Sequence, residues 1–165
     1  MRIGGERVNQ LEHAIQTALL AEQSGAAATL IVASLLHDYG HLIHEIGEDV
    51  FRRGLDDRHE IVGAEELSTF FGDAITIPIK LHVEAKRYLC AIDPEYMKTL
   101  SPASTWSLKL QGGAFSAAEI DEFIKRPFAN DAAKLRHWDE SAKQLGLCTP
   151  NLEHFRQYVE ACLVG

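Results

Sequence analysis

The sequence predicts an all-α fold, a single bundle of about seven helices. Apolar residues recur at intervals of three and four along most of the chain, which is the period of a helix with one buried face. Alternating, β-branched runs that would form strands are scarce. With 165 residues, 46% of them apolar, the chain is long enough for one core and short for two. We therefore expect residues 1–165 to form one domain.

The first two helices are predicted from apolar spacing. An apolar residue recurs every three or four positions at Val8, Leu11, Ile15 and Leu19, and Gly25 then offers a stop. The segment 26–39 is apolar nearly all round, as expected for a helix at the centre of a bundle. A charged segment, 45–58, follows, and loops of about fifteen residues are uncommon and often functional.

A glycine and a proline predict where the helices in the middle of the chain begin and end. A third helix is expected over 58–71, ended by Gly72, and a fourth over 74–89. Pro78 lies near the first turn of that fourth helix, where a missing N–H is tolerated.

The end of the chain is also expected to be helical. Pro94 and Pro102 each begin a short helix, and a glycine pair at 112–113 forms a turn. Ser116 and Glu119 form a capping box that opens the next helix. The last two helices are predicted over 129–145 and 151–163.

The composition excludes several classes of partner. Lys and Arg total 16 against 24 Asp and Glu, a formal charge of −8, whereas nucleic-acid binding needs a basic stripe. No apolar run approaches the length of about 20 residues that a bilayer span needs, and the first residues lack a secretion pattern. Three cysteines without a CxxC pair indicate reduced thiols. We expect a cytoplasmic protein that binds neither nucleic acid nor membranes.

The eight histidines are the unusual feature. His37 and Asp38 end an apolar helix, where the pair is either exposed at a helix terminus or neutralised by a cation. His13, His59, His82 and Asp139, taken singly, are more often structural or surface residues. Taken together, four imidazoles and two carboxylates on five predicted helices are typical of metal sites inside helical bundles. Six ligands exceed one tetrahedral zinc and suit two metals, whether iron, manganese or zinc.

These residues resemble a known family. His13, the adjacent His37 and Asp38, and Asp139 match the HD-domain signature, while His59 and His82 match its two-metal branch. Over almost the whole chain the sequence is similar to the HD-domain mixed-valent di-iron oxygenases of phosphonate catabolism, whose type member acts on 2-amino-1-hydroxyethylphosphonate; myo-inositol oxygenase is a more distant relative. The matching segments are IGGERVNQLEHA, LLHDYGH, HEIVGAEEL, HVEAKRYL, LSPAS, LQGG and RHWDE.

The resemblance implies a cofactor of two iron ions, Fe(II) and Fe(III), with O2 as co-substrate. One iron would be held by His13, His37, Asp38 and Asp139, and the other by Asp38, His59 and His82, with Asp38 bridging. The implied reaction cleaves the carbon–phosphorus bond of a small 1-hydroxyphosphonate and releases phosphate, with Asp38 and Lys86 as the candidate catalytic residues.

The same resemblance implies a phosphonate subsite, with Glu6 near a substrate amino group. Its candidate residues are Glu6, His41, Lys86, Ser104, Gln111 and Arg136. Lys and Arg are the expected partners of a phosphonate dianion, although without the resemblance Lys86 and Arg136 would be read as an exposed ion-pairing face and Ser104 as a helix cap. One position departs from the family: Ile3 stands where the family has a tyrosine thought to gate an iron.

Two other functions stay open at this point. A metal-dependent phosphohydrolase acting on a nucleotide or phosphate ester would use a comparable ligand set, because a metal-bound hydroxide attacks phosphorus without O2. A non-catalytic HD module that binds a ligand or partner is the third possibility, although such a module would not need all six ligands.

Overall fold

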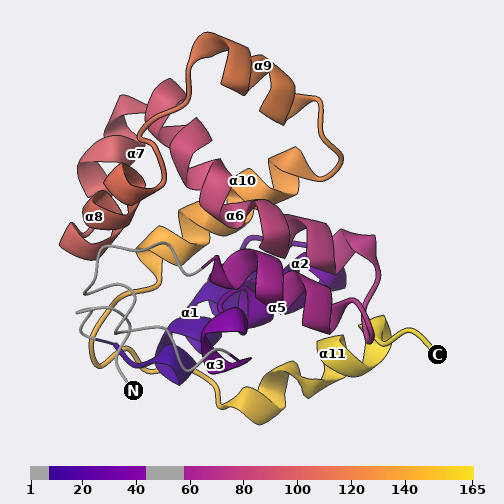
Figure 1. Cartoon of the computed structure of the whole chain (residues 1–165). Helices are drawn as coiled ribbons and strands as arrows, with labels where there is room; N and C mark the ends of the chain where they lie inside the picture. Colours follow the sequence, from indigo (N-terminus) through magenta and orange to yellow (C-terminus); the bar gives the residue numbers. More distant parts are fainter. Residues whose placement is uncertain (1–7, 44–57) are drawn as a thin grey trace.

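The computed structural model of the chain describes residues 8–43 and 58–165 (Figure 1). Regular structure in these ranges is helical apart from isolated bridge residues, among them the antiparallel pair Phe71 and Leu163, so the all-α prediction is confirmed. The elements are α1 Gln10–Gln23, α2 Ala28–Leu36, α3 Gly40–Ile43, α5 His59–Leu67, α6 Asp73–Ile92, α7 Pro94–Thr99, α8 Pro102–Leu110, α9 Ala117–Ile124, α10 Ala129–Ser141, the 3₁₀ helix η1 Leu152–Phe155 and α11 Arg156–Cys162.

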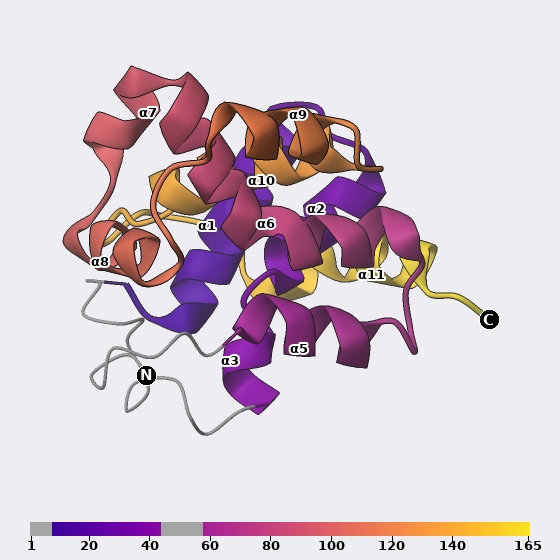
Figure 2. The ribbon, with the colours of Figure 1, turned by 45° about the horizontal axis from the view of Figure 1, so that its top comes forward.

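Helix α6 runs through the middle of the molecule and organises the rest. It packs against α10 on one side and against α5 and α2 on another, and α1 packs against both α2 and α10 (Figures 1 and 2). Helices α7, α8 and α9 gather around the C-terminal half of α6, while α11 lies against α2 at the other end. The packed interior between α1, α2, α5, α6 and α10 is where inward-pointing side chains of five elements can meet.

Local sequence rules explain where most helices begin. Ser116 and Glu119 form the predicted capping box, in which each side chain bonds the other residue's backbone N–H. Pro94 and Pro102 occupy first helical positions as expected. A second capping box, between Asn9 and Glu12, starts α1.

Several predicted boundaries and faces are wrong. Leu11 is exposed, because α1 turns His13, Gln16 and Thr17 inward instead of a purely apolar stripe. The helix predicted over 26–39 ends at Leu36, and the chain turns before α3 begins.

The later segments differ as well. Pro78 lies within α6 rather than at its start, and it is buried there. The segment predicted over 129–145 ends at Ser141, and that over 151–163 divides into η1 and α11. The charged segment 45–58 lies outside the described residues except for Arg58.

Two further expectations can be checked on the described residues. None of the helices there combines the length and the apolar character needed to cross a bilayer. Cys90, Cys148 and Cys162 are all free thiols.

A glycine contact brings α3 against α5. A Cβ on Gly40 would lie 1.9 Å from the backbone oxygen of His59, and a Cβ on Gly63 would lie 2.9 Å from the backbone nitrogen of Gly40. Only glycine permits backbones to approach this closely. The contact therefore fixes the start of α5, and with it His59, against the turn that carries Asp38.

Replacing Gly40 with alanine should destabilise the fold by about 1–3 kcal/mol, because the added methyl group forces two backbones apart. The change should also move His59. Gly72→Ala is the matched control, since its Cβ would meet nothing within 4 Å and its φ is −80°; its effect should stay within about 0.5 kcal/mol. Denaturant unfolding of both variants measures the difference, and equal stabilities would contradict the contact.

Candidate metal centre

Six side chains from five parts of the fold converge in the interior. His13 comes from α1, His37 from the end of α2, His59 from the first position of α5, His82 from α6 and Asp139 from α10, and Asp38 follows α2 directly. They form two groups, in each of which the potential ligand atoms lie within 4.8 Å of one another. The first group is His13, His37, Asp38 and Asp139, and the second is Asp38, His59 and His82.

The first group is the more tightly clustered and the more buried. His13 Nε2 lies 2.9 Å from Asp139 Oδ1 and 3.2 Å from His37 Nε2. His37 Nε2 lies 3.4 Å from both Asp139 Oδ1 and Asp38 Oδ2. Both imidazoles are almost inaccessible to solvent. Their Nε2 atoms therefore converge with two carboxylates, at separations that ligands of one metal ion can have.

Asp38 connects the two groups through its two different oxygens. Its Oδ2 faces the first group, whereas its Oδ1 lies 3.1 Å from His59 Nε2 and 3.7 Å from His82 Nε2. His59 Nε2 and His82 Nε2 are 3.4 Å apart. A carboxylate placed in this way has the geometry of a bridge between two neighbouring cations.

In three of the four histidines, a hydrogen bond from Nδ1 holds the ring so that Nε2 points inward. Nδ1 donates to a backbone oxygen in His13 (Ala142, 2.8 Å) and in His37 (Ser34, 2.7 Å). His82 Nδ1 donates likewise to Ile79, at 2.6 Å. A proton on Nδ1 leaves the Nε2 lone pair free to bind a metal, which is the usual arrangement around histidine ligands.

On the outer side of His59, Nδ1 lies 3.7 Å from the Glu60 carboxylate. His41, predicted to lie near the metals, stacks its ring on that of His59, with the ring centroids 3.8 Å apart. His41 Nε2 lies 3.9 Å from Asp38 Oδ1, so His41 borders the second group although α2 does not continue that far.

The charges of the cluster favour cation binding. Burial alone lowers the pKa of His37, but Asp38 and Asp139 outweigh it and raise that pKa well above its usual value. Burial disfavours the ionised form of Asp139, yet Arg136 and His37 hold the pKa of that carboxyl well below its usual range. Burial lowers the pKa of His82 to about 4, so its imidazole is neutral near pH 7. Ionised carboxylates and inward Nε2 atoms fit two metal ions with mixed nitrogen and oxygen ligands.

Lys86 and Arg136 lie buried beside the first group, in one polar network with Ser104. Lys86 Nζ donates to Ser107 Oγ at 2.6 Å, and burial, then the charge of Arg136, lowers the pKa of Lys86 to about 7. Arg136 bonds Asp139 through Nη1 and Ser104 Oγ through Nη2, the latter at 3.2 Å. The structure therefore brings these three predicted residues close to a proposed metal ligand.

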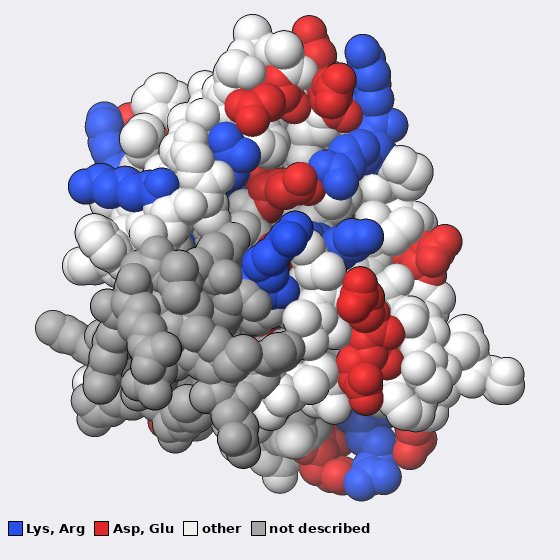
Figure 3. All heavy atoms as spheres, in the orientation of Figure 1, with Lys and Arg blue, Asp and Glu red and all other residues white. Residues whose placement is uncertain are grey.

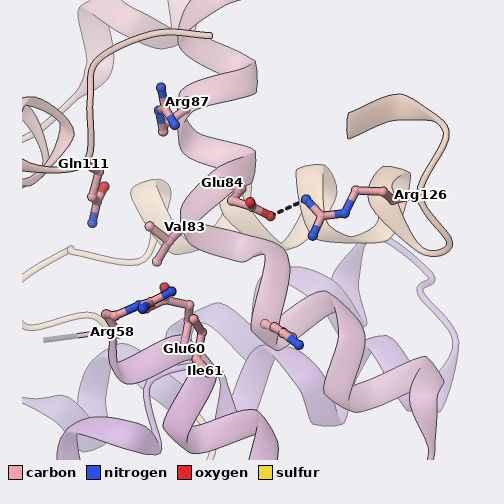
Figure 4. Close-up of a pocket in the computed structure, with 9 residues that line it drawn as sticks. Arg58, Glu60, Ile61, Val83, Glu84, Arg87, Gln111 and Arg126 are labelled. Carbon is pink, nitrogen blue, oxygen red and sulfur yellow. Dashed lines mark hydrogen bonds and ion pairs between the residues drawn. The ribbon is translucent and has the colours of Figure 1, made fainter. Parts of the chain in front are cut away.

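Gln111 lies at the end of α8. It caps the C-terminus of that helix, and its Oε1 is buried with no hydrogen-bond partner among the described residues. It lines a pocket of about 380 Å³ beside α6, together with Arg58, Glu60, Ile61, Lys80, Val83, Glu84, Arg87 and Arg126 (Figure 4). Arg126 bonds Glu84 across this pocket at 2.6 Å. No hydrogen bond among the described residues joins Gln111 to Lys86, Ser104 or Arg136, so its predicted place in the phosphonate subsite gains no support.

The surface around this pocket carries charges of both signs. On the face that contains it, Lys and Arg side chains gather near the middle, with Asp and Glu side chains among them (Figure 3). Glu6 and Ile3 lie outside the described residues, so their predicted roles near the substrate stay predictions.

Sequence reasoning missed Glu140, Lys143, Tyr96 and Ser107, which complete the polar network. Glu140 accepts a hydrogen bond from Arg136 Nη2 at 2.5 Å, and Arg136 Nε donates to the Tyr96 hydroxyl at 2.8 Å. The spacing of four residues between Arg136 and Glu140 on a predicted helix was a usable signal. No sequence rule pairs Tyr96 with Arg136, because the contact joins α7 to α10.

The chain is similar to known proteins over most of its length. The HD domain family matches residues 11–93, which include His13, His37, Asp38, His59 and His82. Hydroxymethylphosphonate dioxygenase of Gimesia maris is 50% identical over 159 residues, 96% of this chain and 79% of that protein. The glycine-betaine-forming [1-hydroxy-2-(trimethylamino)ethyl]phosphonate dioxygenase of Leisingera caerulea is 45% identical over 94% of this chain and 80% of its own length. A protein of Acanthamoeba polyphaga mimivirus is 39% identical over 92% of this chain and 70% of its own length.

Proposed function

The chain belongs to the HD-domain family and is an oxygenase, and from this premise we propose that it uses O2 to cleave the carbon–phosphorus bond of a small 1-hydroxyphosphonate. The observation that carries the proposal is the pair of ligand groups joined by Asp38, with Lys86 and Arg136 beside it. Candidate substrates are hydroxymethylphosphonate, 2-amino-1-hydroxyethylphosphonate and its N-methylated analogues, because relatives named for two such compounds cover most of the chain.

The residues present fit the two iron ions of this proposal. His13, His37 and Asp139 would hold one iron, His59 and His82 the other, and Asp38 would bridge them. When bound, an Fe(II)/Fe(III) pair supplies the activation of O2 that removes a hydrogen from the hydroxyl-bearing carbon. Ligand type alone also permits manganese or zinc, so the choice of iron rests on the family.

The protein's own groups bind and neutralise the phosphonate. Within the described residues, four of the five N–H groups of Arg136 are bonded to Tyr96, Asp139, Ser104 and Glu140, which leaves one on Nη1. Lys86 uses one N–H on Ser107, and its other two have no partner in residues 8–43 and 58–165. Both cationic groups are almost fully buried, so a phosphonate oxygen bound there is shielded from water and attracted strongly.

The overall reaction balances without a further reductant. A 1-hydroxyphosphonic acid, RCH(OH)PO3H2, and O2 give RCOOH and H3PO4. The carbon–phosphorus bond breaks, the carbon loses four electrons and O2 gains four. The protein's part is to orient the substrate carbon and to keep water away from it.

The Lys86 amine should impose a pH dependence on substrate capture. Only its ammonium form attracts a phosphonate, and its pKa of about 7 means that this form is lost as the pH rises through neutrality. We expect kcat/KM to fall above about pH 7 in the wild type. The Lys86→Arg variant, whose guanidinium does not titrate in this range, should lack that fall relative to the wild type. Substrate ionisation affects both proteins equally, so parallel pH profiles would contradict this role of Lys86.

The proposed function is tested by incubating reduced, iron-loaded protein with the three candidate substrates, with and without air. Phosphate release and O2 uptake in a ratio of one to one support it. Release of phosphate from phosphate esters under strict anaerobiosis would instead support the hydrolase alternative. Absence of phosphate release from every 1-hydroxyphosphonate in air would refute the proposal.

A further inference from the structure

We infer that Glu140 is a positioning residue of the phosphonate subsite, an inference that rests on the proposed function. Glu140 follows Asp139 on α10, and its side chain is only 3% exposed. It belongs to neither of the two ligand groups found among the described residues, and its partners are the residues that surround the proposed phosphonate position.

Both oxygens of the Glu140 carboxylate are fully used. Oε2 accepts hydrogen bonds from Arg136 Nη2 at 2.5 Å and from Ser104 Oγ at 2.8 Å. Oε1 accepts from the Ser101 backbone N–H at 2.8 Å and from Lys143 Nζ at 3.3 Å. Glu140 therefore ties α10 to the N-terminal turn of α8, which begins at Pro102.

These bonds decide what Ser104 can do. Its single hydroxyl proton is donated to Glu140, and its oxygen accepts from Arg136 Nη2 and from Lys143 Nζ at 3.0 Å. A hydroxyl has one donor, so Ser104 has none to offer a phosphonate in this arrangement. Ser104 then serves by holding Arg136 in place rather than by donating to the substrate.

Glu140 also acts on both cationic groups of the subsite. It holds one edge of the Arg136 guanidinium while Asp139 holds the other, which fixes the direction of the remaining Nη1 proton. By anchoring α8 it also fixes Ser107, whose hydroxyl donates to the Ser104 backbone oxygen at 3.1 Å and accepts from Lys86. One carboxylate thus sets the spacing between Arg136 and Lys86.

A positioning role and a purely electrostatic role predict opposite results for Glu140→Gln. The substitution keeps the shape of the side chain and removes one negative charge from the subsite. If charge alone mattered, an anion would bind more tightly. If Glu140 positions Arg136 and α8, the amide disturbs both contacts. An anion then binds more weakly, by about 10–100-fold, as is typical when a residue that orients a binding group is replaced.

The experiment measures the affinity of metal-loaded, anaerobic protein for hydroxymethylphosphonate and for inorganic phosphate by calorimetry. We expect Glu140→Gln to weaken both about 10–100-fold, with metal content unchanged and kcat at saturating substrate within about threefold. Glu84→Gln, which alters the exposed pair with Arg126, is the matched control and should bind like the wild type. Affinity equal to or tighter than the wild type in Glu140→Gln overturns the inference.

A second variant covers the case in which Glu140→Gln does not fold. Ser104→Ala removes only the hydroxyl that joins Glu140 to Arg136, and it should weaken phosphonate binding without loss of metal. Wild-type affinity in Ser104→Ala would overturn the inference. Failure of the metal-loaded wild type to bind either anion would overturn the proposed function as well, which separates the two outcomes.

Discussion

Replacing Asp38 with alanine should empty both metal sites at once and reduce phosphate release by on the order of 10³-fold or more. The reason is geometric: Asp38 is the residue shared by the two ligand groups, with Oδ2 toward His37 and Oδ1 toward His59. Its loss takes one ligand from each ion and also the negative charge between them. Metal analysis of the purified variant gives the result directly.

His82→Ala is the informative comparison for this prediction. His82 belongs to the second group alone, so its removal should lower the metal content from two ions toward one. Asp121→Ala, which removes an exposed carboxylate on α9, serves as the control and should keep both. Retention of two ions in the Asp38 variant would show that the assignment of the ligands is wrong.

Replacing Arg136 with alanine should cost about 3–5 kcal/mol of stability in the metal-free protein, because it leaves buried carboxylates uncompensated. Arg136 bonds both Asp139 and Glu140, and the charge of Arg136 lowers the pKa of each carboxyl despite its burial. For a chain of this size the loss corresponds to a fall in Tm of roughly 6–20 °C. Thermal unfolding followed by circular dichroism measures it.

The chain offers a matched control for Arg136 on its surface. Arg126 pairs with Glu84 at 2.6 Å, but both side chains are more than two-fifths exposed. Such pairs contribute about 0–1 kcal/mol, so Arg126→Ala should leave Tm almost unchanged. Similar changes in Tm for the two variants would contradict the view that burial makes the Arg136 network structural.

The sequence predicted those parts of the fold that depend on local rules. The capping box at Ser116 and the starts at Pro94 and Pro102 follow from backbone chemistry within one turn, and the structure has all three. The face of α1 could not be predicted in this way. Leu11 is exposed because α1 turns His13 toward Asp139 on the same buried face that carries Ile15 and Ala18.

The candidate site was predictable in its ligand types and less so in its surroundings. His and Asp pairs in apolar helices are conspicuous because burial makes them unfavourable without a partner. The roles of Glu140 and Ser107 depend on contacts between α8, α10 and α6, which no spacing rule specifies. The subsite role predicted for Gln111 stays a prediction, since the structure shows it only at the end of α8, lining a pocket beside α6.

The Nδ1 hydrogen bonds of three imidazoles have an evolutionary consequence. His13, His37 and His82 each donate to a main-chain oxygen, which no side-chain substitution can remove. The Glu60 carboxylate lies 3.7 Å from His59 Nδ1. Point mutations at position 60 can therefore change the charge beside His59 while those three main-chain bonds stay constant, so that relatives of this protein could diverge in reactivity on one side of the cluster without rebuilding its centre.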